Sequence, residues 1–433
     1  MGNMKKNILK IVAFLLIAIA ACVGIYFLPP VYSRLSWRVD ELRTRIKYAL
    51  NPPEQAIFVP QASTPLALPT LTVTPLPPTP TLTPDCGAAC FTATPTPPPT
   101  ETPLPSPTPT PLPLQAKLKG VKHEYQHWNN CGPATLAMAL SFWGWEGTQT
   151  DTAPVLKPND RDKNVMPYEM AAYVQDHTNL RVQIRHGGDL ETLRRFIASG
   201  FPVLIEKGFE GVDFDGWMGH YEVLTSYDLD DDSFLAQDSY QGPDKRLSGP
   251  DIYANWRAFN FIYMIIYPAE REAEVMALMG EQWDEMANWQ FAADKAKAET
   301  TTLTGRDQYF AWYNLGSSLT SMGQYSQAAA AFDEAFRLYP SIPEKTRPWR
   351  MVWYQTGPYF AYYFTGRYQD VIDLATTTLD AMNEPVLEES FVWRARARAA
   401  LGDKEGAIAD LNQALKVHAD FRPALDELAI LGG

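Results

Sequence analysis

Cysteine and histidine are both scarce in this sequence of 433 residues, which contains four cysteines and six histidines. Cys86 and Cys90 are separated by three residues, but a zinc site would need two further ligands nearby, and the sequence has none there. A thiol redox motif would need a folded neighbour, which is also missing. The histidines show no metal-ligand spacing with cysteine or carboxylate. We therefore expect no metal and no cofactor, and a local or intermolecular disulfide between Cys86 and Cys90.

Basic charge is also scarce, and the formal net charge is −13. Residues 115–268 carry 14 basic and 21 acidic side chains, which gives −7, and residues 269–433 carry 15 and 24, which gives −9. Nucleic-acid-binding domains concentrate positive charge on one face. The acidic balance of both regions therefore argues against nucleic acid as a partner.

Long apolar runs are limited to the N-terminus, where an uncharged stretch from Ile11 to Leu28 follows three lysines. Eighteen residues of helix rise about 27 Å, close to the hydrocarbon thickness of a bilayer. We predict a transmembrane signal anchor over residues 1–30, with a lipoprotein cleaved before Cys22 as the alternative. Residues 31–51 combine basic and apolar positions at helical spacing. They predict an amphipathic helix that rests on a membrane surface or forms a solvated stalk.

Residues 52–114 form a Pro/Thr-rich tract with 20 of the 36 prolines of the chain. Such a sequence cannot pair its backbone or bury a core, so it predicts a disordered, extended linker. Tracts of this kind usually stand outside cells. We therefore expect a single-pass protein of the cell membrane with its soluble domains outside the cytoplasm.

With Cys22 in the apolar run, Cys131 is the cysteine that remains for the globular part of the chain. It begins an apolar helical stretch, and Pro133 suits the first turn of a helix. The positive end of a helix dipole favours a thiolate over a thiol. Gln126, five residues earlier, could join the Cys131 N–H in binding an oxyanion. A small buried cysteine is the alternative reading.

His220 supplies the base that such a nucleophile needs. It opens the apolar strand 219–225, and a turn rich in aspartate separates this strand from a second one that ends at Asp238. A hairpin would place His220 and Asp238 side by side, so that Asp238 orients the imidazole towards the thiol. The turn at 228–232 lacks the glycine and glutamate of a calcium loop and predicts a solvated turn.

The order of Gln126, Cys131-Gly132-Pro133, Gly219-His220-Tyr221 and Asp238 resembles that of the papain-like cysteine peptidases related to the bacteriocin double-glycine leader peptidases. The resemblance covers roughly Lys117 to Pro268. It implies that Gln126, Cys131, His220 and Asp238 are oxyanion donor, nucleophile, general base and orienting acid. Gln126 lies five residues before Cys131, whereas papain-like enzymes more often have this glutamine six residues before the cysteine. No transporter segment follows, so cleavage coupled to export is not implied.

Helical and strand patterns in residues 115–268 predict an α+β domain of the papain-like type. Helices are expected over 131–142, 167–176 and 190–198, and strands at 202–205, in the His220 hairpin and at 259–267. The helix end that carries Cys131 should face His220 on the sheet.

Residues 269–433 predict an all-α tetratricopeptide-repeat solenoid. The segment 309–342 has the signature spacing of one repeat, and glycines at 323, 366 and 402 mark turns between paired helices. A further unit is expected around Gly280. Such arrays bind peptides or partner proteins on a concave face. Whether the aromatic residues at 349–363 line that face or the core is left open.

The sequence as a whole predicts a membrane-anchored cysteine peptidase that acts on a peptide or protein and uses the repeats to bind a substrate or partner. Two alternatives remain. The first is a non-catalytic peptide-binding scaffold that keeps the papain-like shape, and the second is an amidase or acyltransferase with the same triad.

Overall fold

The computed structural model describes residues 2–28, 31, 42, 46, 57–61, 111–159, 164–210, 216–382 and 384–432. Of the described residues, 57–60 and 113–432 belong to one compact unit. The amphipathic helix predicted over 31–51 and most of the linker predicted over 52–114, including Cys86 and Cys90, lie outside the described residues.

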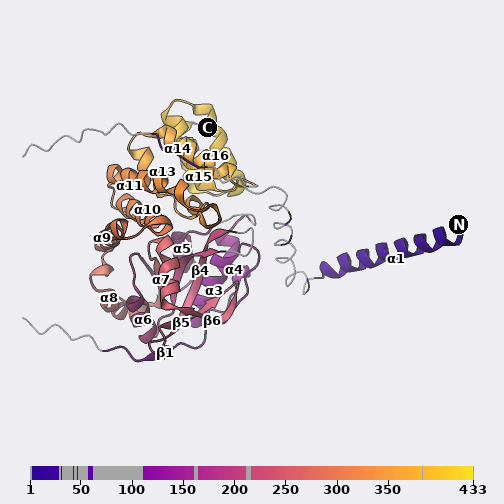
Figure 1. Ribbon diagram of the computed structural model, residues 1–433, viewed down its shortest axis with the longest axis horizontal. Coiled ribbons are helices and arrows are strands. Elements are labelled where there is room, and N and C mark those ends of the chain that lie inside the picture. The colour runs from indigo at the N-terminus through magenta and orange to yellow at the C-terminus, as the bar shows by residue number, and fades with distance from the viewer. Residues whose placement is uncertain are drawn as a thin grey trace, which may run out of the picture. The chain divides into compact units, whose positions relative to one another are not determined.

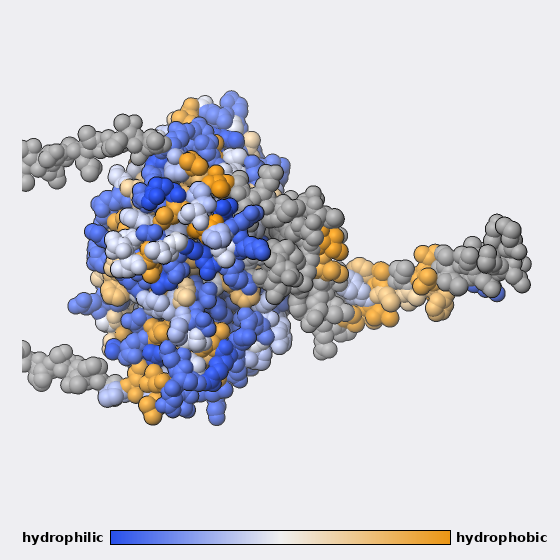
Figure 2. Space-filling model, in the orientation of Figure 1, coloured by the Kyte–Doolittle hydropathy of each residue, from blue (hydrophilic) through white to orange (hydrophobic). Residues whose placement is uncertain are grey.

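The N-terminal apolar run forms helix α1 (Gly2–Tyr26), whose exposed apolar side chains are visible in Figure 2. None of the helices in the described ranges is both long and apolar enough to cross a bilayer. The transmembrane anchor predicted for residues 1–30 is therefore not supported by the structure. The location outside the cytoplasm stays a prediction.

An antiparallel sheet with helices on both faces forms the region from Gln115 to Pro268 (Figure 1). Its strands are β1 (Gln115–Lys117), β2 (Leu180–Arg185), β3 (Val203–Glu210), β4 (Trp217–Asp228), β5 (Ser233–Asp238), β6 (Gly242–Ser248) and β7 (Tyr263–Pro268). Six of them follow the order β2-β7-β3-β4-β5-β6, and β1 pairs with the end of β4. Its helices are α3 (Cys131–Phe142), α4 (Gln149–Leu156), α5 (Pro167–His177), α6 (Leu190–Ala198) and α7 (Gly249–Trp256), followed by the 3-10 turn η1 (Arg257–Phe259).

Alternation of side chains along the central strands fills two separate cores. Val203, Ile205 and Leu224 face a cluster built with α6 and α7, whereas Leu204 and Val223 face one built with α3, α4 and α5. Strands β3 and β4 are buried along most of their length because helices cover both faces. The α+β arrangement predicted from sequence is confirmed.

Paired helices make up the C-terminal region. They are α8 (Glu272–Met279), α9 (Glu285–Thr302), α10 (Gly305–Ser321), α11 (Tyr325–Leu338), α12 (Met351–Tyr354), α13 (Gly357–Phe364), α14 (Tyr368–Asp380), α15 (Glu388–Ala400), α16 (Lys404–Val417) and α17 (Arg422–Leu431). Short 3-10 turns lie at Ala269–Arg271, Gly280–Trp283, Tyr339–Ser341 and Glu344–Thr346. The three predicted turn glycines, Gly323, Gly366 and Gly402, have φ of +71°, +75° and +88°. Only glycine adopts such values at little cost, so these residues end one helix and allow the next to fold back.

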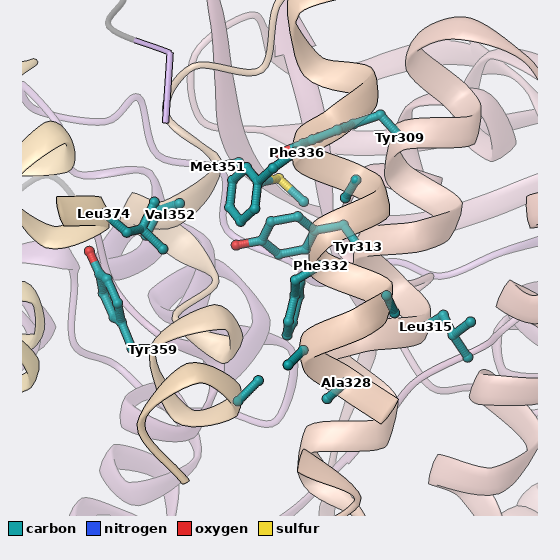
Figure 3. Close-up of a cluster of buried hydrophobic side chains, with 14 of the residues drawn as sticks. Tyr309, Tyr313, Leu315, Ala328, Phe332, Phe336, Met351, Val352, Tyr359 and Leu374 are labelled. Atoms are coloured by element: carbon teal, nitrogen blue, oxygen red, sulfur yellow. The ribbon is translucent and has the colours of Figure 1, made fainter. Parts of the chain in front are cut away.

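Aromatic side chains form the core of this helical region. Tyr313 and Phe332 meet edge to face at 5.0 Å between α10 and α11, and Figure 3 shows Phe336, Met351 and Val352 around them. A Cβ on Gly316 would lie 2.7 Å from the Phe332 ring, so the repeat needs glycine there for the two helices to pack. Of the aromatic residues left open above, Trp353, Tyr359 and Tyr362 belong to the core.

The sheet region and the helical region share one hydrophobic cluster. Trp217, Ala258 and Phe259 from the sheet region pack with helical-region residues in that cluster. Arg350 Nη1 donates to Trp217 O at 2.8 Å, and Gln355 Nε2 donates to Ala258 O at 2.7 Å. Both bonds cross a buried or partly buried interface, so the two regions are held in a fixed relative position.

A short segment before the Pro/Thr-rich tract also packs on the helices. Phe58 is 6% exposed and meets Phe336 edge to face at 5.0 Å and Tyr362 at 6.1 Å. Its neighbour Val59 is 73% exposed. The segment is therefore held mainly by one aromatic side chain that enters the helical core.

Replacement of Phe58 by alanine should release this segment without unfolding the helices. Truncation of a buried phenylalanine costs about 3–5 kcal/mol, and here the loss acts on a few residues that can detach locally. A protease of broad specificity should then cut between residues 57 and 60 quickly, while α10 and α11 stay intact. Val59→Ala is the matched control and should leave the rate of this cut unchanged. A cut between residues 57 and 60 that is as fast in the wild type as in Phe58→Ala would contradict the docking of Phe58.

Candidate active site

Cys131 is the first residue of α3, and its side chain is partly exposed. The next residue explains why the helix starts in this tight position. A Cβ on Gly132 would lie 2.9 Å from Val165 Cβ, so glycine allows the helix end to approach the segment before α5. Thr135 Oγ1 donates to Tyr221 O at 3.2 Å and ties α3 to β4. The thiol thus lies at a helix N-terminus that is fixed against the central sheet.

The loop before Cys131 is held by Gln149, a residue that the sequence analysis did not identify. Gln149 Oε1 accepts from His127 N at 2.7 Å and from Asn130 Nδ2 at 3.0 Å. Its Nε2 donates to Tyr125 O at 2.8 Å. Lys157 Nζ donates to Asn129 O at 3.0 Å. These bonds fix the turn that presents the thiol.

His220 and Asp238 come together as the hairpin predicts. Val223 pairs with Gln237 across β4 and β5, which places Asp238 at the end of β5 next to the start of β4. His220 Nε2 lies 3.0 Å from Asp238 Oδ1, and both side chains are buried. Tyr240 N and Gln241 N donate to the same oxygen at 2.7 Å and 2.8 Å. Because a carboxylate accepts all three bonds, Nε2 carries a proton and Nδ1 is left for the thiol.

The thiol of Cys131 and the imidazole of His220 lie close enough for each to change the pKa of the other. Burial alone would raise the pKa of the Cys131 thiol, but the hydrogen bond and charge of His220, with smaller contributions from the Tyr221 N–H and Lys157, lower it below its usual value of 9.0. Burial would lower the pKa of His220, yet Asp238 and Cys131 raise it to about 10. The pair therefore favours the thiolate form of Cys131 more than an unpaired cysteine would, with His220 as the imidazolium partner.

The carboxyl group of Asp238 is ionised for the same reason. Burial would raise its pKa, but the charge and hydrogen bond of His220 and the two backbone N–H groups bring the pKa of Asp238 well below its usual value. Asp238 thus keeps a full negative charge against the imidazolium.

A second buried ion pair lies beside the triad. Lys207 Nζ is 2.6 Å from Glu222 Oε1, and both side chains are almost fully buried. The ligand atoms of His220, Glu222 and Asp238 all lie within 4.8 Å of one another, a grouping that could hold a metal ion. Here the ammonium of Lys207 already neutralises Glu222, and His220 is engaged by Asp238 and Cys131. The arrangement is therefore explained by proton chemistry at the thiol rather than by a metal site.

Gln126 is held next to the triad, although its predicted role is not decided by these contacts. Its backbone N–H donates to Ser239 O at 2.8 Å, and its side-chain Oε1 accepts from Ser239 Oγ at 2.8 Å. Since Ser239 engages the oxygen end of the amide, Nε2 is the end suited to donate to an oxyanion.

The other residues considered in the sequence have structural roles. Asp231 and Asp232, in the turn that was compared with a calcium loop, form ion pairs with Arg246 and Arg194. His186 stacks its ring on Trp289 at 4.0 Å where the two regions meet. His123 Nε2 lies 3.0 Å from Asp238 O and supports the end of β5.

Comparisons with known proteins agree with the division into two regions. Residues 118–264 match the family described as Peptidase C39 like, and residues 309–342 match the tetratricopeptide repeat. Two curated proteins, each named aryl-hydrocarbon-interacting protein-like 1, from Mus musculus and Rattus norvegicus, are 25% identical over 151 residues, which cover 32% of this chain and 46% of each relative. The chain thus spans less than half the length of these curated relatives.

A solved structure described as a C39-like peptidase from Bacillus anthracis matches with a TM-score of 0.30 and 16% identity, over 35% of this chain and 96% of that one. The family matches give the chain a C39 peptidase-like domain joined to a region with a tetratricopeptide repeat. The resemblance stated from the sequence is confirmed.

Proposed function

We propose that the chain is a cysteine peptidase that hydrolyses peptide bonds with Cys131, His220 and Asp238, and that its helical region binds protein. The observations that support this most directly are the hydrogen bond between His220 and Asp238 and the mutual effect of Cys131 and His220 on their pKa values. The match of residues 118–264 to a peptidase-like family points to the same chemistry.

In the first step, the Cys131 thiolate attacks the carbonyl carbon of the scissile peptide bond. A C–S bond forms, and the carbonyl oxygen becomes an oxyanion beside the N–H groups at the start of α3. Helix N-termini leave such N–H groups without helical partners, and Gln126 Nε2 is the proposed second donor. The C–N bond then breaks while His220 gives its Nδ1 proton to the leaving amine, and a thioester remains on Cys131.

In the second step, His220 takes a proton from water as the water oxygen attacks the thioester. The C–S bond breaks, the carboxylic acid leaves, and the proton on His220 restores the imidazolium beside the thiolate. Asp238 holds the ring in the orientation that both transfers need. One water is consumed for each peptide bond, and no other reactant is required.

A peptidyl chloromethyl ketone tests this proposal. The full chain should be alkylated at Cys131, and labelling should be lost in Cys131→Ala and strongly slowed in His220→Ala. Cys22→Ala is the matched control, because Cys22 is an exposed thiol outside the site, and it should label at Cys131 as the wild type does. Labelling that persists unchanged in Cys131→Ala would remove the proposed mechanism. A non-catalytic scaffold predicts peptide binding without labelling.

The same labelling should depend on pH in a defined way. The rate should rise as pH passes through the lowered pKa of Cys131, below 9.0, because the thiolate is the reactive form. It should remain high until His220 loses its proton at a pH of about 10. In His220→Ala the rise should move to higher pH, since burial then raises the pKa of the thiol without an opposing partner. An unchanged profile in that variant would show that the two groups are not paired.

A further inference from the structure

A cavity of about 350 Å³ lies where the sheet region meets the helical region. Tyr168, Glu206 and Phe259 line it from the sheet region. Trp289 of α9 and Tyr354 of α12 line it from the helices. The C-terminal region therefore forms part of the cavity wall. Its role differs from that of a repeat array that only binds a partner away from the peptidase-like domain.

Hydrogen bonds across the interface give this cavity a fixed shape. His186 N donates to Asn288 Oδ1 at 2.9 Å, and Asn288 Nδ2 donates back to His186 O at 2.8 Å. Asn260 Nδ2 donates to Ser318 Oγ at 2.9 Å. Pockets of this size that are formed before binding are typical of ligand sites.

The cavity lies close to one of the proposed catalytic residues, because the charge of Cys131 acts on two of its lining residues, Glu206 and Tyr354. A Cβ placed on Gly219, the residue before His220, would lie 3.3 Å from Glu206 Oε1, 3.2 Å from Tyr354 Cε1 and 2.7 Å from Phe259 Cζ. All three of these side chains line the cavity.

The opposite wall reaches Cys131 in a similar way. Val165 packs against Gly132, the residue after Cys131, and the cavity wall begins at the next residue, Met166. A peptide bond placed at the thiol would therefore bring a neighbouring substrate residue to the cavity.

The lining is aromatic and acidic. Tyr168, Phe259, Trp289 and Tyr354 supply rings, and Glu206 is 96% buried at the wall, where burial raises the pKa of its carboxyl group well above its usual value until a counter-charge arrives. Glu285 adds a second, exposed carboxylate. None of the lining residues is a lysine or an arginine.

The one histidine in the wall does not change this charge balance. Burial and the charge of Arg185 lower the pKa of His186, so that its ring is neutral at physiological pH. Aromatic faces attract cations, and a buried carboxyl group gains a counter-charge when a cation enters.

We propose that this interface cavity binds the side chain of a lysine or arginine next to the scissile bond, with its stem between the aromatic rings and its charged end at Glu206. The inference rests on the proposed peptidase function, and it assigns the helical region a part in substrate selection.

Matched peptides test this selection. A set of fluorogenic peptides carries arginine, or its uncharged isostere citrulline, at each position around the cleaved bond. At one position the arginine peptide should be hydrolysed with a kcat/KM at least about tenfold higher than that of the citrulline peptide. The reason is that a hydrogen bond to a charged group is stronger than one between neutral groups. In Glu206→Gln this ratio should fall to near one. Glu210→Gln is the matched control, because Glu210 ends the same strand, pairs with Arg306 and does not line the cavity. It should keep the wild-type ratio.

A second measurement, of peptide binding, separates the two proposals. It also decides the matter if a variant at Glu206 folds poorly. Binding of the arginine and citrulline peptides to Cys131→Ala needs no turnover and should show the same preference. Trp289→Ala, on the helical wall, should weaken binding of the arginine peptide about tenfold. Equal binding of the two peptides would overturn the cavity assignment even if the wild type hydrolyses both. A preference for arginine without any hydrolysis would support the cavity and contradict the peptidase.

Discussion

Replacement of Cys131 by alanine should lower kcat/KM for any cleaved peptide by about 10⁴-fold or more. The variant lacks the atom that forms the thioester, so only binding and oxyanion stabilisation would remain. His220→Ala should lose a similar factor, because the thiol then loses both the group that ionises it and the acid that protonates the leaving amine. The measurement is steady-state hydrolysis of the arginine peptide.

The double variant makes this expectation sharper. Residues that act as one unit are not additive, so Cys131→Ala/His220→Ala should be no slower than either single variant. Cys22→Ala should keep wild-type turnover. Thermal melting of each variant checks that the fold is retained. Independent, multiplying losses in the double variant would show that the two residues do not act in the same step.

Replacement of Lys207 by methionine should destabilise the protein by about 3–5 kcal/mol. The change leaves the carboxylate of Glu222, which is fully buried, without its counter-charge 2.6 Å away. The double variant Lys207→Met/Glu222→Gln should recover a large part of this loss, since no buried charge remains. Urea unfolding at neutral pH measures both. Equal stability of the single and double variants would contradict the assignment of a buried ion pair.

The loss should also depend on pH. Burial already raises the pKa of Glu222 against the opposing charge of Lys207, and removal of Lys207 raises it further. A carboxyl group with a raised pKa in the folded state stabilises the fold only while it is protonated, so its contribution is lost as pH rises from about 4 towards neutrality. The deficit of Lys207→Met should therefore be smaller near pH 4 than at pH 7.

The pairing of His220 with Asp238 could be predicted because the two residues are only 18 positions apart in the sequence. His220 and Asp238 lie on two strands of one hairpin, and a register shift between Leu224 and Ser226 puts both side chains on the same face. Cys131 was marked by its place before an apolar helix. The turn glycines of the helical repeats were visible for a similar reason, since each lies between two short amphipathic helices.

The residues that support the site could not be predicted, because their interaction partners are distant in the sequence or of an unusual kind. Gln149 is an ordinary polar residue in the sequence, and only the folded loop shows that its side chain binds four groups, on Glu124, Tyr125, His127 and Asn130. Glu206 and Lys207 did leave a signal, because they follow directly on the apolar run 202–205. The predicted strand ended at that run, whereas β3 continues to Glu210 and carries both charges into the core. The interface cavity depends on how two regions pack, which no periodicity encodes.

The docking of Phe58 changes what the Pro/Thr-rich residues can do for the protein. Residues 57–60 and residues 113–117 both belong to the same folded unit, the former through Phe58 and the latter through β1 and the bond from Tyr227 Oη to Pro113 O. The tract therefore starts and ends at the same folded unit. Its length does not determine how far the Cys131 thiol can lie from residue 1. While the tract is intact, Phe58 rebinds at a high effective concentration. A single proteolytic cut inside it would turn that contact into a dissociable complex, so that dilution would separate the C39 peptidase-like part from the N-terminal helix.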